Sequence, residues 1–171
     1  MKNNFISFQF LFVMLIGCQQ KESPNIDLSQ IIEDIKWNDS YSKVEQIFEK
    51  KYNLEFDREI KQQDGSIAYK YIGGKINGIK SQSWTALFAG DSLHALDVMI
   101  LSETDEQNSD KLKELKNDIE ALQFDKQLID DDFWVISIDD KSYCGINLVT
   151  NQNVISAVIH ISKKFNKYTM S

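Results

Sequence analysis

The segment SDKLKELKNDIEALQ, residues 109–123, is followed by WVISI at 134–138, CGINL at 144–148 and ISAVIHI at 155–161. In residues 109–123 the aliphatic side chains Leu112, Leu115, Ile119 and Leu122 recur at helical spacing, and Ser109 can cap the first turn. In the three later segments apolar residues alternate with other residues, which is the period of a strand. The connections are short, at 139–141 and 151–153, so the three strands should be antiparallel.

The first half of the chain repeats this order. Helical spacing predicts a short helix at 27–35 and a second at 41–52, after the cap cluster Asn38-Asp39-Ser40. Leu54, Phe56 and Ile60 then alternate with acidic residues, and Asp64-Gly65 predicts a hairpin turn. Further strands are expected at 67–71, at 75–89 with a bulge, and at 93–101.

The predicted fold class is α+β, with an antiparallel sheet of about six or seven strands in two meanders and two or three helices packed on one face. We expect one globular domain at 26–171, whose halves 40–101 and 109–162 can be a degenerate duplication. This order resembles the tandem layout of the β-lactamase-inhibitor-protein family, in which helices pack over one concave antiparallel sheet. The resemblance implies an inhibitor or immunity role.

The composition indicates a globular protein that does not bind nucleic acid. Hydrophobic residues make up 42% of the 171 residues, enough to build a core and to exclude a disordered chain. The 26 acidic residues outnumber the 19 basic ones, and the net charge of −7 would repel a phosphate backbone.

The N-terminus has the pattern of a secretory signal. Lys2 precedes an apolar run from Phe5 to Ile16, which is too short for a membrane-spanning helix. The end of the run, Leu15-Ile16-Gly17-Cys18, resembles the lipobox of bacterial lipoproteins. The alternative is an ordinary signal peptide with a chance cysteine.

That resemblance implies a signal peptide at 1–17, acylation of Cys18 and a lipidated tether at 18–25. Acyl chains on Cys18 would make the membrane a partner. Gln19 follows the cysteine in place of the aspartate that retains many lipoproteins at the inner membrane, so we expect the outer membrane of a bacterial envelope.

Gly90-Asp91-Ser92-Leu93 is the sharpest catalytic signal. It resembles the motif of the GDSL esterases, in which the serine is the nucleophile. The other blocks of that family, Gly-x-Asn-Asp and a late Asp-x-x-His, are not found. Gly-Asp between two apolar strands is also a good turn, so we favour a hairpin and keep a small serine esterase using Ser92 as the alternative.

The remaining candidates point to structural roles. Cys144 shares the phase of Ile146 and Leu148 and should be a core thiol, and His94 shares the phase of Leu96 and should lie at the edge of the core. His160 should be exposed. Trp134 should fill the core, whereas Trp84 suits the core and a binding face about equally.

We therefore expect no catalytic residues, no metal site and no cofactor. The hypothesis from the sequence is an outer-membrane lipoprotein, anchored through Cys18, whose domain binds another protein in an inhibitor, immunity or assembly role.

Overall fold

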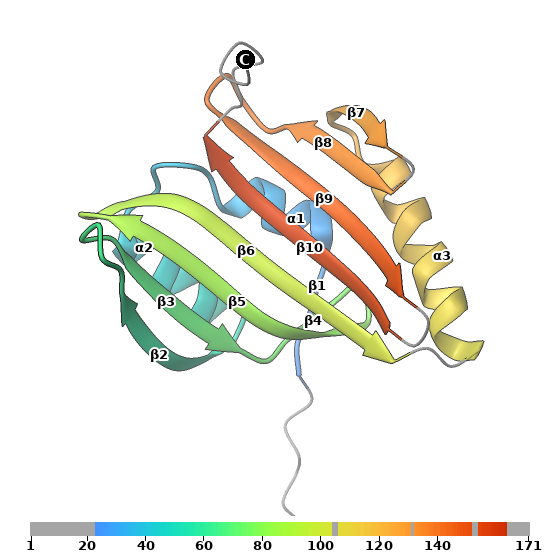
Figure 1. Cartoon of the computed structure of the whole chain (residues 1–171), viewed down its shortest axis with the longest axis horizontal. Helices are drawn as coiled ribbons and strands as arrows, with labels where there is room; N and C mark the ends of the chain where they lie inside the picture. The colour runs from blue at the N-terminus through green and yellow to red at the C-terminus, as the bar shows by residue number, and fades with distance from the viewer. Residues whose placement is uncertain (1–22, 104–105, 131, 152–153, 164–171) are drawn as a thin grey trace, which may run out of the picture.

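The computed structural model describes residues 23–103, 106–130, 132–151 and 154–163 (Figure 1). In the first half, strand β1 (Asn25–Ile26) leads into helix α1 (Leu28–Asp34), then α2 (Tyr41–Glu45), which continues as the π-helical turn η1 (Gln46–Lys51). The strands that follow are β2 (Glu55–Lys61), β3 (Ile67–Ile72), β4 (Lys75–Ile76), β5 (Ile79–Ala89) and β6 (Ser92–Glu103). The second half holds α3 (Glu106–Ala121), β7 (Asp125–Asp130), β8 (Phe133–Ser137), β9 (Ser142–Asn151) and β10 (Val154–Lys163).

Eight strands form one curled antiparallel sheet in the order β2-β3-β5-β6-β10-β9-β8-β7 (Figure 1). Each half contributes a four-stranded meander, and the last strands of the two meanders pair in the middle, with Met99 opposite Val158. A short branch joins the sheet beside β5, where β1 pairs parallel with β4. The α+β class and the order of helix and meander, twice, are confirmed, whereas the number of strands is larger than predicted.

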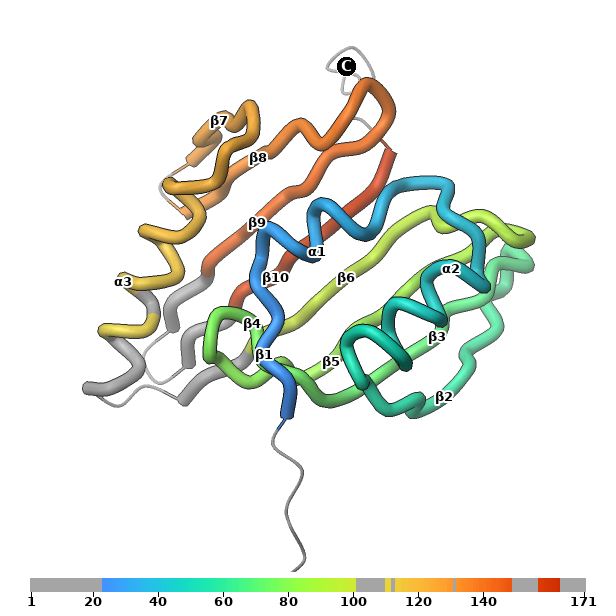
Figure 2. The backbone as a smooth tube through the Cα atoms, turned by 180° about the vertical axis from the view of Figure 1, so that it is seen from behind, coloured from blue at the N-terminus to red at the C-terminus, as the bar shows by residue number. Residues whose placement is uncertain are grey.

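The helices place the core on one side of the sheet. Figure 2 shows α1 and α2 in front of the sheet, with α3 beside the second meander. We call this side the helix-covered face and the opposite side the open face. Phe48 of η1, Trp84 of β5 and Leu96 of β6 are fully buried on the helix-covered face. On α3, Leu115 and Ile119 are buried, and Leu122, the residue after its end, is half-buried, as the helical stripe predicted. The side chain of Leu112 lies outside the described residues.

Two predictions about strands are wrong. The expected strand at 75–89 is two strands, because Asn77 and Gly78 both have positive φ and form a tight turn between β4 and β5. The predicted alternation of buried and exposed residues after Leu54 also fails. Leu54 is buried but precedes β2, and all seven residues of β2 are exposed because this strand is the edge of the sheet.

In the described parts of the chain, no helix is long and apolar enough to cross a membrane. Cys18 and the expected signal peptide lie outside the described residues. Asn25, at the end of the expected tether, already belongs to the sheet through β1, and the backbone N–H of Lys75 donates to the carbonyl of Pro24 at 2.8 Å.

Candidate functional site

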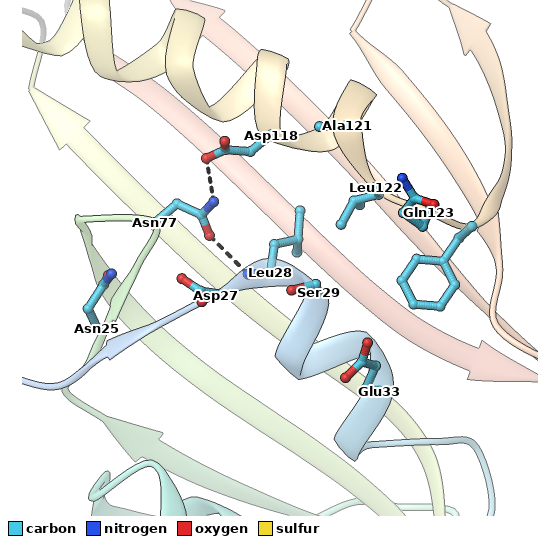
Figure 3. A pocket seen from close by; sticks show the side chains of 11 residues that line it. Asn25, Asp27, Leu28, Ser29, Glu33, Asn77, Asp118, Ala121, Leu122 and Gln123 are labelled. Carbon is cyan, nitrogen blue, oxygen red and sulfur yellow. Dashed lines mark hydrogen bonds between the residues drawn. The ribbon is translucent and has the colours of Figure 1, made fainter.

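A cleft of about 640 Å³ opens where β1 and α1 meet the end of α3 (Figure 3). Three segments that are distant in sequence form its walls: residues 25–33 from β1 and α1, the turn between β4 and β5, and residues 118–124. The lining side chains are Asn25, Asp27, Leu28, Ser29, Glu33, Asn77, Asp118, Ala121, Leu122, Gln123 and Phe124.

Asn77 holds two walls of the cleft together. Its Oδ1 accepts a hydrogen bond from the backbone N–H of Leu28 at 2.9 Å, and its Nδ2 donates to Oδ2 of Asp118 at 2.5 Å (Figure 3). The positive φ of Asn77 places the residue in the tight turn, a conformation that asparagine tolerates. The adjacent Gly78 N–H donates to Oδ1 of Asn25 at 2.7 Å, which ties the turn to β1 as well.

The carboxylate of Asp27 is left available to a ligand. Asp27 is the N-cap residue of α1, a position at which the side chain usually accepts a hydrogen bond from its own helix. Here the side chain of Asp27 makes no such bond, and the first N–H of the helix, that of Leu28, is satisfied by Asn77 instead. The side chain of Glu33 also has no hydrogen-bond or ion-pair partner in the described part of the chain.

The chemistry of the cleft suits a cationic group with an apolar stem. Asp27, Glu33 and Asp118 supply three carboxylates, and no Lys, Arg or His lines the cleft. Leu122 and Phe124, both half-buried, supply an apolar wall. Lysine and arginine side chains combine an apolar stem with a charged end, so they match both parts of this lining. Among the described residues no cluster of three metal-ligating side chains occurs.

Ser92 lies in a hairpin, as favoured from the sequence. It is the first residue of β6, directly after the turn at Gly90, and its backbone pairs with Ala89 and Ser40. Asp91 accepts a hydrogen bond at Oδ1 from the backbone N–H of Tyr41, the first residue of α2, at 3.1 Å. The segment therefore ties the hairpin to the start of α2. No hydrogen bond joins Ser92 to a histidine among the residues described.

The two histidines lie apart on β6 and β10. Against the prediction, His94 is exposed, because β6 has a bulge there: Phe88 pairs with Leu93 and Leu87 with Ala95, so His94 is the extra residue and the phase shifts. His160 lies on the open face and is half-exposed, and its Nδ1 is 2.5 Å from Oδ1 of Asp97 on the neighbouring strand. This pair could not be predicted from the sequence, because it follows from the β6–β10 register, in which His160 lies opposite Asp97.

The other candidates belong to the core. Cys144 is fully buried, and burial raises the pKa of its thiol to about 12, so the thiol is protonated at neutral pH. Trp134 is buried and its indole N–H donates to Oε1 of Glu120 at 2.6 Å. Trp84, which the sequence left open, is fully buried, and its indole N–H donates to the carbonyl of Gly73 and to Oγ of Ser81.

The lining of the cleft was not found from the sequence. Asn77-Gly78 is the one local signal in it, because this dipeptide between apolar residues is typical of a tight hairpin turn. Comparisons of the chain with protein families, with curated proteins and with solved structures find no match.

Proposed function

We propose that the chain is a lipoprotein of the bacterial outer membrane, anchored through Cys18, and that its domain binds another protein through the cleft. The observation that carries the proposal is the cleft itself, in which three carboxylates and an apolar wall occur without a neutralising cation. A lysine or arginine side chain of a partner would bring the missing charge. An inhibitor, immunity or assembly role is compatible with such a contact.

The fold supports a partner close to the membrane. The carbonyl of Pro24 accepts a hydrogen bond from the backbone N–H of Lys75, so the domain includes Pro24, which follows Cys18 by about six residues in the sequence. Even a fully extended chain of six residues spans no more than about 20 Å. Asp27 follows three residues after Pro24, so the anchor and one wall of the cleft belong to the same short segment.

Photo-crosslinking in the native membrane tests the contact. A photoreactive residue in place of Gln123, which lines the cleft and is exposed, should give one discrete protein adduct. The double variant Asp27→Asn, Glu33→Gln should reduce this adduct by at least about fivefold, the effect of losing about 1 kcal/mol of binding. Asp110→Asn is the matched control, because Asp110 is an exposed carboxylate on α3 away from the cleft lining. An adduct that survives the double variant, or one that the control also removes, would contradict the proposal.

The anchor has its own test. Cys18→Ser in the full chain should leave an uncut precursor that no longer incorporates labelled palmitate. Processing and fractionation like the wild type would show that Cys18 is not lipidated.

A further inference from the structure

The edge strand β2 has the features of a self-pairing surface. Its seven residues are all exposed, and β3 is the only strand that pairs with it in the described sheet (Figure 1). Ile60, near its end, is 40% exposed on the open face, opposite Ala68 of β3. An edge strand with unpaired backbone groups and an exposed aliphatic side chain can accept another strand.

The direction of the backbone groups identifies which residues can pair. The backbone N–H of Gln62 donates to the carbonyl of Ser66, so the N–H and C=O groups of Gln62 point toward the chain that forms β3. Successive residues of a strand point their backbone groups to opposite sides. The N–H and C=O groups of Glu59 and Lys61 therefore point outward, away from the sheet.

We propose that two copies of this chain form a two-fold dimer through antiparallel pairing of their β2 strands, with the axis at Ile60. In this register Glu59 of each copy lies opposite Lys61 of the other, and the two Ile60 residues lie opposite each other. The two Glu59–Lys61 pairs supply the outward backbone hydrogen bonds and opposite charges on one face. The two Ile60 side chains meet at the axis on the other face.

Within one copy the same two charges already attract each other, with Nζ of Lys61 at 3.9 Å from Oε1 of Glu59. The side chains of Glu59 and Lys61 lie on the same face of the sheet as those of Tyr69 and Ile67, which are their partners on β3. Glu59 and Lys61 can therefore form ion pairs with a second copy while their side chains stay on the same face of the sheet. The two charges complement a second copy of β2 and disfavour strands that lack opposite charges at these positions, which favours self-pairing.

The opposite edge, β7, does not suit the same pairing. Both edge strands contain a bulge. The bulge of β7, between Leu128 and Asp130, interrupts its ladder at its exposed aliphatic residues, whereas the bulge of β2, between Phe56 and Arg58, lies outside the segment Glu59–Lys61. Its one cation, Lys126, donates to the carbonyl of Leu122 at the end of α3. A second copy of β7 would therefore meet an irregular backbone and no available lysine on this strand.

Disulfide trapping tests the axis. In the full chain, Ile60→Cys should form a covalent dimer on mild oxidation in membranes, because directly opposed residues in a non-hydrogen-bonded pair lie about 4.5 Å apart at Cα, within disulfide range. Ile72→Cys is the matched control, since Ile72 is 37% exposed on the same face but lies on β3. A dimer band with the first variant alone supports the proposal. Equal bands from both variants, or no band from the first, overturn it.

A charge exchange tests the register. Glu59→Lys should weaken dimerisation of the detergent-solubilised chain by at least about fivefold, measured by sedimentation, because both cross-strand pairs become repulsive. Adding Lys61→Glu restores opposite charges across the axis and should restore the dimer. A monomeric wild type, or a double variant no better than Glu59→Lys, would overturn the proposed pairing.

Discussion

Truncation of Leu115 gives the clearest test of how the second half is held together. Leu115 lies on α3 and is 2% exposed, in the same core cluster as Ile119. Leu115→Ala removes three carbon atoms from this core. At about 0.8 kcal/mol for each buried carbon, the lost transfer free energy is about 2.4 kcal/mol. A void of roughly 80 Å³ that does not collapse adds up to about 2 kcal/mol.

The expected loss is therefore about 2.5–4.5 kcal/mol in the free energy of unfolding. Urea denaturation of residues 19–171, which keep Pro24 and β1 but carry no lipid, measures it. With a slope of about 2 kcal/mol per molar urea, the midpoint should fall by roughly 1.2–2.2 M.

Lys113→Ala is the control on the same helix. Its Nζ lies 3.7 Å from Oδ1 of Asp110, and 73% of the Lys113 side chain is exposed. An exposed ion pair of this kind contributes little, so the change should stay within about 0.5 kcal/mol. If Leu115→Ala and Lys113→Ala shift the midpoint equally, α3 does not pack on the sheet through its aliphatic stripe.

Three further predictions follow from single contacts. Cys144→Ala should cost about 1 kcal/mol because it leaves a small void, and thiol reagents should label native Cys144 only at the rate of unfolding, since its pKa is raised to about 12. Asp91→Ala should cost about 1 kcal/mol by removing an acceptor at the start of α2, whereas Ser92→Ala should leave the melt unchanged; loss of an esterase activity in folded Ser92→Ala would favour the enzyme alternative. Burial acts to raise the pKa of Asp139, but hydrogen bonds from two backbone N–H groups lower it below its ordinary value. This stabilisation exists above the unfolded pKa and is lost as pH falls through the folded pKa, so melts of wild type and Asp139→Asn should converge below about pH 4.

The elements that could be predicted are those in which one face is buried. On α3, Leu115 and Ile119 repeat at helical spacing because that side contacts the core. On β9, Cys144 and Ile146 alternate for the same reason. Periodicity records burial, so it identifies helices and internal strands without any knowledge of their neighbours.

The elements that failed are those in which burial does not alternate. The sequence of β2 alternates, but every residue of this strand is exposed because it is an edge of the sheet. The other edge, β7, is exposed at nearly every residue, and its sequence carries no period-two signal from which it could be predicted. His94 failed for a different reason, because a bulge adds one residue and reverses the phase of everything before it. The position of this bulge depends on how β5 pairs with β6, and a local sequence pattern does not contain that information.

The cleft could not be predicted from the sequence because it forms only through contacts between segments that are distant along the chain. Its carboxylates are ordinary surface residues until Asn77 links Asp118 to the start of α1. Asp27, the N-cap residue of α1, makes no side-chain bond to its own helix, so its carboxylate is available to a ligand. Since Pro24 and Asp27 lie three residues apart, the proposed membrane anchor and the proposed binding site share one short segment. A partner that binds Asp27 would therefore be held close to the proposed anchor.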